Sequence, residues 1–308
     1  MQVKVTPLHP RTNQPIYALD ASPDGRVLAL GQQSDPAGNA YLTLWDLATL
    51  DQLREVESGL VEMIHSARFA PDNTALAYVR NDMHVHLYDL GQQESDILPT
   101  EDGEVHKVSY AFNRNVFVAS GSSIEVWDGE RRDSLWTLIG QQAEEQRGEL
   151  TLLGALDPDA TRVAVIGTQA GEAVVYDLSS KSVVQSLPGA PARARSLAFD
   201  PSGHYLAAIE ANSNGIIIWD TRSGEPHLPQ LFNMQARDYC SLAFHPDGEH
   251  MALGMLGDYV LIVRLKDGAF VFDKPVHRGQ VWDLAFTRDG HRLISGGHDG
   301  VAYLYDLS

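Results

Sequence analysis

Residues 277–306 read HRGQVWDLAFTRDGHRLISGGHDGVAYLYD, and this stretch decides the fold. An apolar run at 281–286 is followed by the turn TRDG at 287–290, a second apolar run, another polar turn and a segment that ends in Tyr305-Asp306. Asp bonds nearby backbone amides and Gly accepts a positive φ, so both are typical turn residues. Short apolar runs between such turns predict antiparallel β-strands.

The same unit recurs along the chain. The turn, with Pro, Asp and Gly in most copies, returns at 22–25, 70–73, 157–160, 200–203 and 245–248, and a degraded copy lies at 112–115. The closing pair of an aromatic residue and Asp also stands at 45–46, 88–89, 127–128, 176–177 and 219–220, with a mean spacing of about 43 residues, whereas the sixth unit has Val263-Arg264. A fixed period of roughly 40–45 residues is typical of architectures built from repeated supersecondary units.

The seven units resemble the WD-repeat family, and the resemblance covers nearly the whole chain. Six aromatic-Asp pairs at regular spacing, each after a turn of the right kind, carry it. The resemblance implies an all-β fold, a seven-bladed β-propeller of four-stranded antiparallel blades, with residues 1–308 as a single propeller domain. Strands such as 216–218 and 260–263 are apolar on both faces, as expected where a blade packs between two others. Because no segment has a period near 3.6, almost no helix is expected.

Closure of the last blade is expected to involve the N-terminal segment. The seventh unit supplies only three strands before Ser308, and residues 2–8 (QVKVTPL) precede the first unit as a spare strand. The resemblance implies that residues 2–8 complete blade seven. Such pairing would remove the open edges of that blade.

The amino-acid composition of the chain limits the kinds of partner that it is expected to bind. The chain has 308 residues with 23 Lys and Arg against 41 Asp and Glu, a net charge of −18. This balance argues against nucleic acid, whose phosphates need clustered basic residues, and against an anionic membrane surface. The single cysteine, Cys240, allows no internal disulfide, and neither a leader peptide nor a bilayer-spanning stretch is evident. We therefore expect a cytoplasmic protein with neither nucleic-acid nor membrane partners.

Blade seven contains a Ser, a His and an Asp that invite two interpretations. Together they could indicate a hydrolase. The resemblance implies instead that four residues form a buried hydrogen-bonded network that locks the strands together: His277, Ser295, Asp299 and Tyr305. Tyr305 stands where the family usually has Trp, which leaves the last link of this network open. No catalytic residue is predicted.

Two histidines in the second unit could form half of a metal site. His84 and His86 are two residues apart on an expected strand and so would share a face. Two ligands are too few for a structural zinc. We expect solvated strand histidines, with neither a metal nor a cofactor.

The start of each inner strand is expected to lie on one face, around the central channel. Aligning the repeats on their turns places Trp282 with Tyr17, His65, His106, Leu152, Arg195 and Cys240. Glu62 and Glu104 lie nearby in units two and three, so the face should be basic and aromatic on one side and acidic on the other. Trp, Tyr and Arg are enriched at interface hot spots. The predicted partner-binding residues are Tyr17, His65, His106, Arg193, Arg195, Arg237, Arg278 and Trp282.

The sequence thus predicts a non-catalytic scaffold or adaptor subunit. It would bind a protein or peptide partner through the channel-side face, with Trp282 as the anchor. Fold alone does not decide function, and two alternatives remain open. One is a propeller hydrolase, lactonase-like, for which His65 and His106 with Glu62 and Glu104 are the candidate groups. The other is a sensor that binds a small ligand or peptide in the channel.

Overall fold

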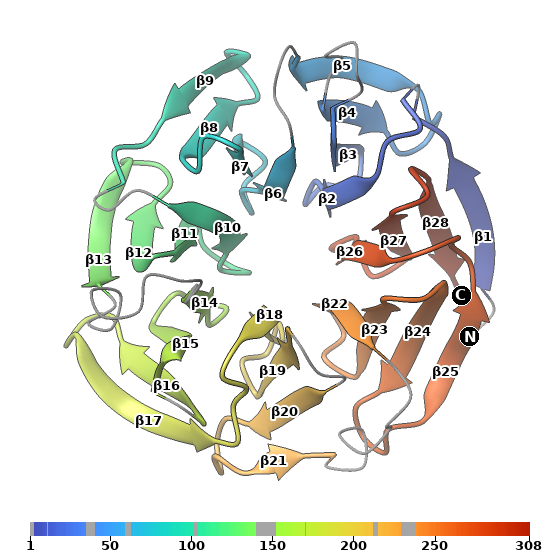
Figure 1. Cartoon of the computed structure of the whole chain (residues 1–308). Helices are drawn as coiled ribbons and strands as arrows, with labels where there is room; N and C mark the ends of the chain where they lie inside the picture. The colour runs from blue at the N-terminus through green and yellow to red at the C-terminus, as the bar shows by residue number, and fades with distance from the viewer. Residues whose placement is uncertain are drawn as a thin grey trace.

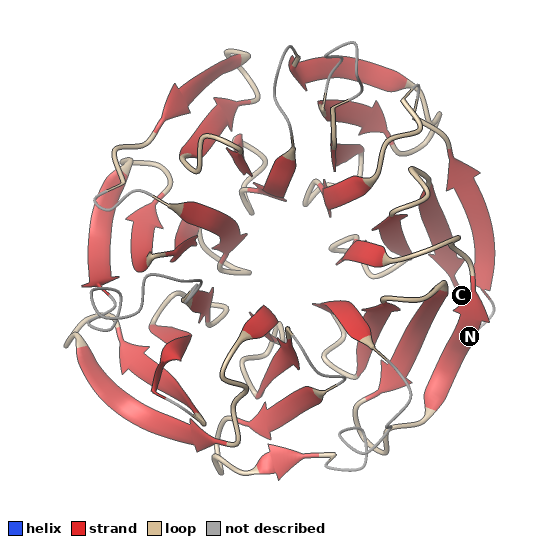
Figure 2. Ribbon diagram, in the orientation of Figure 1, coloured by secondary structure: helices blue, strands red, loops and turns tan. Residues whose placement is uncertain are grey.

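The computed structural model describes residues 3–10, 12–34, 41–58, 63–100, 104–139, 152–169, 171–211, 215–228 and 238–308. These residues form seven four-stranded antiparallel sheets arranged around a central axis (Figure 1). All of their regular elements are strands (Figure 2). Within the described ranges, no helix has the length and apolar character that a bilayer crossing requires. The predicted all-β, seven-bladed propeller is confirmed.

Each blade runs from an inner strand at the channel to an outer strand at the rim. Blade one consists of β2 (Ile16–Ala21), β3 (Val27–Gln32), β4 (Leu42–Asp46) and β5 (Gln52–Glu57). Blade two consists of β6 (Ile64–Phe69), β7 (Ala75–Arg80), β8 (Val85–Asp89) and β9 (Glu94–Ile97). Blade three consists of β10 (Val105–Tyr110), β11 (Val116–Gly121), β12 (Ser123–Asp128) and β13 (Asp133–Ile139). Blade four consists of β14 (Leu153–Leu156), β15 (Arg162–Gln169), β16 (Glu172–Asp177) and β17 (Ser182–Pro188).

The remaining three blades follow the same order. Blade five consists of β18 (Ala194–Phe199), β19 (Tyr205–Glu210), β20 (Ile216–Asp220) and β21 (Pro226–His227). Blade six consists of β22 (Tyr239–Phe244), β23 (His250–Met255), β24 (Tyr259–Arg264) and β25 (Phe270–Pro275). Blade seven consists of β26 (Val281–Phe286), β27 (Arg292–Gly297), β28 (Ala302–Leu307) and, from the other end of the chain, β1 (Val3–Leu8).

The aspartates of the closing pairs hold the turns that follow them. The Asp46 carboxylate accepts the amides of Ala48 and Thr49, both at 2.8 Å. Such side-chain acceptance of amides two or three residues on is the reason that Asp favours turns. The same contact type recurs at Asp89, Asp128, Asp177 and Asp220. The aspartate of each repeat is therefore explained by the backbone amides that it binds in the turn after it.

The hydrophobic core is divided among the seven interfaces between neighbouring blades. Each of seven buried clusters draws side chains from two adjacent blades. Trp45 of blade one, for example, shares a cluster with Ile294 and Leu304 of blade seven. Burial of apolar surface is the main stabilising contribution, so each blade depends on both of its neighbours.

Strand β1 closes the propeller. It pairs with β28 in antiparallel register, with Val5 opposite Tyr305 and Leu8 opposite Ala302. The two ends of the chain therefore lie side by side at the rim of blade seven (Figure 1). The predicted closure by the N-terminal strand is confirmed.

Candidate functional site

Six inner strands share one irregularity, a β-bulge near the start of the strand. In blade seven, for example, Val281 pairs with Gly297 and Asp283 with Gly296, so Trp282 has no place in the ladder. A bulge leaves one residue unpaired and re-aims its side chain. We call the six bulged residues the bulge ring: Tyr17, His65, His106, Arg195, Cys240 and Trp282.

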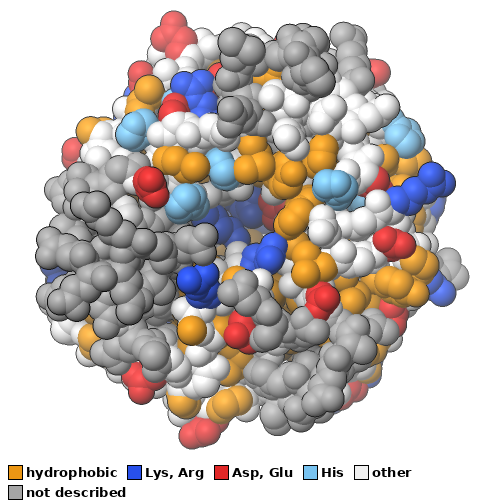
Figure 3. Space-filling view, in the orientation of Figure 1, with side chains coloured by type: hydrophobic (Ala, Val, Ile, Leu, Met, Phe, Trp, Pro, Cys, Tyr) orange, Lys and Arg blue, Asp and Glu red, His pale blue; other side chains and the backbone are white. Residues whose placement is uncertain are grey.

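All six residues of the bulge ring line one cavity of about 220 Å³, which we call the chamber. The described part of the inner strand of blade four has no bulge: Leu153 pairs directly with Ile166 and lines the chamber, whereas the preceding Leu152 is buried. The space-filling view shows a hollow at the centre of the face, where Lys and Arg side chains gather and His and apolar side chains lie nearby (Figure 3). The alignment of inner-strand starts thus corresponds to one physical site.

Within the chamber, Trp282 is partly exposed and lies between an aromatic and a cationic side chain. Its ring centroid is 5.4 Å from that of Tyr17, and the Arg195 guanidinium carbon lies 5.8 Å from it. Arg195 also donates to the Ala211 carbonyl at 3.2 Å and approaches the Cys240 sulfur at 3.7 Å. An arginine at this distance from an indole makes a cation–π contact. The planar groups of the three blades are therefore held together on one side of the chamber.

The two histidines occupy another part of the bulge ring. The rings of His65 and His106 meet edge to face, with centroids 6.4 Å apart. Burial and the neighbouring His106 hold the pKa of His65 below its usual value. Burial raises the pKa of the Cys240 thiol to about 11, so this cysteine is a weak nucleophile at neutral pH.

An ion pair that the sequence reasoning missed forms the inner wall of the chamber. Arg68 donates to both carboxylate oxygens of Asp283, at 2.9 and 3.1 Å. Asp283 also accepts the amide of Leu19, and Arg68 donates to the Leu19 carbonyl, each at 2.9 Å. These contacts tie inner strands of blades seven, one and two. A charged residue within an otherwise apolar inner strand, as in VWDLAF at 281–286, was the available signal.

Beyond this pair lies a second cavity of about 250 Å³, and three side chains line both cavities: Arg68, Lys107 and Ser196. Asp20 lines the second cavity and its Oδ2 accepts the Phe69 amide at 2.8 Å. Burial raises the pKa of Asp20 to about 6, although the Arg68 charge and the amide oppose the rise. Charged side chains therefore line both cavities of the channel.

The remaining predicted partner-binding residues lie outside the chamber or outside the described structure. Arg193 and Arg278 are exposed and do not line the chamber. Glu104 is exposed as well. Arg237 and Glu62 lie outside the described residues. The expected division of the face into basic and acidic sides therefore stays a prediction.

The blade-seven residues form a continuous hydrogen-bonded chain. His277 Nδ1 lies 3.0 Å from Asp299, and its Nε2 lies 2.7 Å from the Ser295 hydroxyl, which lies 2.9 Å from the Tyr305 hydroxyl. Burial opposes ionisation of Asp299, but bonds from His277 and from backbone amides outweigh it and hold the Asp299 pKa below its usual value. Tyr305 thus completes the chain in place of a Trp. Ser295 is 0% exposed, so its hydroxyl has no access to a substrate.

The histidines of blade two differ from expectation. His86 is 2% exposed, stacks on Tyr78 and lies 2.9 Å from an Asp82 carboxylate oxygen. The prediction of two solvated histidines on one strand is wrong for His86, which is buried and has the Asp82 carboxylate as a hydrogen-bond partner. His84 precedes β8 and is not on the strand.

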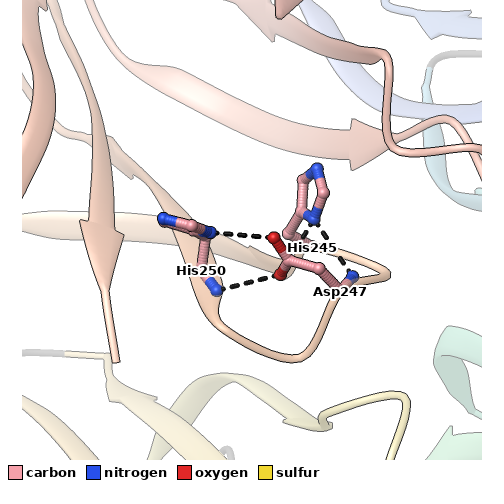
Figure 4. A group of neighbouring side chains, drawn as sticks. All are labelled: His245, Asp247 and His250. Atoms are coloured by element: carbon pink, nitrogen blue, oxygen red, sulfur yellow. Dashed lines mark hydrogen bonds and ion pairs between the residues drawn. The ribbon is translucent and has the colours of Figure 1, made fainter. Parts of the chain in front are cut away.

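One group of potential metal ligands escaped the sequence reasoning. His245 and Asp247, in the turn after β22, and His250, the first residue of β23, bring three ligand atoms within 4.8 Å of one another (Figure 4). The spacing H-x-D-x-x-H was the signal. The protein itself supplies partners: His250 Nδ1 lies 2.9 Å from Asp247, and His245 Nε2 lies 2.9 Å from the Gly290 carbonyl. Three of the four ring nitrogens of the trio therefore have partners within the protein.

Comparisons with known proteins agree with the architecture. A family model described as "WD domain, G-beta repeat" matches residues 269–306. Protein LST8 homolog of Drosophila pseudoobscura pseudoobscura is 24% identical over 189 residues, 60% of this chain and 56% of that protein. Methylosome protein WDR77 of Xenopus laevis is 25% identical over 190 residues, 61% of this chain and 56% of that protein.

A third relative, Actin-interacting protein 1-2 of Arabidopsis thaliana, is 29% identical over 161 residues, 50% of this chain and 25% of that protein. The chain spans about half the length, or less, of these curated relatives. The matched residues comprise β25 of blade six and β26, β27 and most of β28 of blade seven, and the structure contains seven four-stranded blades. The chain therefore contains a segment that matches the WD-repeat model, and over about half of its length or more it is similar to these relatives.

Proposed function

We propose that this chain is a non-catalytic interaction scaffold or adaptor subunit that binds a protein or peptide partner through the bulge ring. The observation that carries the proposal is that bulged side chains from six blades line one chamber at the channel. Bulges occur next to functional sites because they re-aim side chains. Six bulges at the same level place chemically different side chains around one opening.

The residue types in the bulge ring support a binding role. Trp282 and Tyr17 contribute large rigid surfaces, and Arg195 contributes charge and a planar donor group. Residues of these three types dominate the energetics of protein interfaces. Trp282 is partly exposed in the isolated chain, as an anchor residue must be.

The printed names of two relatives point in the same direction. One is an actin-interacting protein and the other is a methylosome protein. These names concern those proteins, and they support a protein partner for a chain that is similar to them without identifying it. We further propose a cytoplasmic location. Because the net charge is −18, we also propose that the chain has no nucleic-acid or membrane partner.

The hydrolase alternative is less well supported. Among the described residues that line the chamber, Asp283 is the one that carries a carboxylate. Arg68 donates hydrogen bonds to both of its oxygens, so Asp283 is poorly suited as a general base. His65 and His106 therefore have no carboxylate partner in the described part of the chamber. A hydrolase screen that returned turnover sensitive to His106→Ala would reverse this preference.

The test compares two variants in affinity purification from the native host. Trp282→Ala removes the anchor from the bulge ring, whereas Val183→Ala removes an apolar side chain, 55% exposed, from the outer strand β17. A partner held at the channel should be recovered with the wild type and with Val183→Ala, and lost with Trp282→Ala. Calorimetry with the purified partner should show a loss of about 2 kcal/mol or more for Trp282→Ala.

Thermal unfolding must accompany these measurements. Trp282→Ala should retain nearly the wild-type melting temperature, because Trp282 is partly exposed. If Trp282→Ala and Arg195→Ala both bind the partner normally while Val183→Ala does not, the partner occupies the outer strands and the proposal is wrong.

A further inference from the structure

The chamber carries a positive charge inside an acidic protein. Among its described lining residues, three side chains are cationic at neutral pH, Arg68, Lys107 and Arg195, and one is a carboxylate, Asp283. With the histidines neutral, this leaves a surplus of two positive charges, whereas the whole chain has a net charge of −18. Arg68 and Asp283 neutralise each other through their two hydrogen bonds. The surplus therefore belongs to Lys107 and Arg195.

Lys107 is a cation without a counterion. It follows the bulged His106 on β10 and lines both cavities of the channel. Its one hydrogen bond is a long one, 3.5 Å from Nζ to the Arg195 carbonyl, and within the described residues it makes no ion pair. Removing an ammonium from water is costly unless a partner compensates it. An anion bound next to Lys107 would compensate the charge of its ammonium group.

Two further donors around the chamber have no acceptor. The Arg195 Nε and the Trp282 Nε1 are both buried, and neither has a hydrogen-bond partner among the residues that the structure describes. Buried donors of native proteins almost always find an acceptor, so such orphans require an explanation. Both belong to side chains that line the chamber and contact each other. An oxygen-rich group in the chamber explains them together with Lys107.

We propose that the chamber binds a small oxyanion, a carboxylate or a phosphate, between Lys107 and Arg195. The cavity of about 220 Å³ has room for such a group together with waters, each of which occupies roughly 30 Å³ in the liquid. The anion enters either as a free ion or as an acidic or phosphorylated side chain of a partner. Binding of the ion alone does not depend on the scaffold role, so the two are tested separately.

The experiment titrates the full chain with sodium phosphate or sodium acetate by calorimetry, at constant ionic strength set by NaCl. The wild type should bind at least one of the two ions saturably. Lys107→Met keeps the length of the side chain and removes its charge. It should weaken binding about tenfold or more, the effect expected from losing one charge-assisted hydrogen bond. Arg195→Gln should weaken it as well.

Arg26→Gln is the matched control, because the Arg26 side chain is 83% exposed and does not line the chamber. It should bind like the wild type. Phosphate also stabilises proteins non-specifically, so the informative quantity is the difference between Lys107→Met and Arg26→Gln at the same salt. Lys107→Met removes a partly buried charge that makes no ion pair with the described residues, so it should fold at least as stably as the wild type without anion, which keeps its result interpretable.

A second readout uses sulfate, which does not titrate near neutral pH. Burial, with the nearby Arg68 charge, lowers the pKa of Lys107 to about 8. Sulfate affinity of the wild type should therefore fall as the pH rises through 8, and that of Lys107→Met should not. The charged and titratable groups facing Lys107 are Arg68, Asp283, Cys240 and Arg195.

Each outcome of these experiments either supports the oxyanion site or overturns it. Saturable binding of a free ion that Lys107→Met abolishes supports the site. If the free ions fail but a short peptide containing Asp or phosphoserine binds in a Lys107-dependent way, the site takes its oxyanion from a side chain. The proposal is overturned if no oxyanion binds above chloride, or if Lys107→Met binds as tightly as the wild type.

Discussion

Arg68 on β6 and Asp283 on β26 are 215 residues apart in sequence, yet two hydrogen bonds of 2.9 and 3.1 Å join them across the inner strand of blade one. Leu19 of blade one contributes both an amide donor and a carbonyl acceptor to the same cluster. A buried ion pair is favourable only when its geometry is good and its remaining polar groups are satisfied. Here both conditions hold, and three blades are fixed relative to one another at the channel.

Breaking this pair should destabilise the propeller. Asp283→Asn leaves the Arg68 guanidinium without its carboxylate, and we expect a loss of about 3 kcal/mol, the lower end for a broken buried pair, because the side chains are 20% and 11% exposed. Urea unfolding measures the loss. Arg264→Gln, which removes an exposed pair with Asp267 within one hairpin, should leave the midpoint unchanged. Equal midpoints for Asp283→Asn and wild type would show that the cluster adds no stability.

The blade-seven network should contribute to stability and not to catalysis. Asp299→Ala leaves His277 and two backbone amides without an acceptor, at a cost of roughly 1–3 kcal/mol. Tyr305→Phe removes only the hydroxyl at the end of the chain and should cost less. Denaturant unfolding of both variants tests the order. A larger loss for Tyr305→Phe than for Asp299→Ala would contradict this account of the network.

Stability should respond to the titration of Asp20. Its pKa of about 6 lies above the ordinary value of 3.8, so between about pH 4 and 6 the folded state holds a proton more tightly than the unfolded state does. Through this group, stability falls as the pH rises across that window, with a slope of at most about 1.4 kcal/mol per pH unit. Asp20→Asn should flatten the slope of unfolding free energy between pH 4 and 6. An unchanged slope would mean that Asp20 ionises normally.

Deletion of residues 1–8 should expose the edge of β28. Strand β1 pairs with β28 from Val3 to Leu8, and Leu8 is buried in the cluster between blades seven and one. An open edge invites pairing with other chains, so the truncated protein should melt at a lower temperature and elute as larger species. A monomeric elution profile together with a wild-type melting curve would argue that β1 is dispensable.

The His245, Asp247 and His250 turn should need no metal. Incubation with a chelator should leave the melting temperature unchanged, because Asp247 and the Gly290 carbonyl already bind three of the four ring nitrogens. His245→Ala should still destabilise the protein, since it removes the bond to Gly290 in the neighbouring blade. A drop in melting temperature on chelation, restored by Zn²⁺ in the wild type but not in His250→Ala, would identify a genuine metal site.

Local chemistry explains why the fold could be predicted. Turn residues and closing aspartates such as Asp46 bind backbone groups only a few residues away, so their spacing in the sequence predicts where each blade begins and ends. The alignment of Trp282 with five other bulged residues was also recoverable, because it depends on distance from those turns. The Arg68–Asp283 pair could not be predicted from the sequence, because its two residues meet only when blades seven, one and two come together in the closed propeller. Lys107 was missed because it lies one residue beyond the aligned position, and His86 was misjudged because its partner Asp82 is fixed by a loop.

The bulges have a consequence for how such a protein acquires specificity. Because a bulged residue is left out of the inner ladder, its side chain can change without altering the pairing on either side of it. Six positions of this kind already hold five residue types, from Cys240 to Trp282, on a common backbone geometry. In the binding role that we propose, mutations at these positions would change what the chamber recognises one residue at a time. The blades that flank them keep their registers, so recognition and folding can diverge independently in evolution.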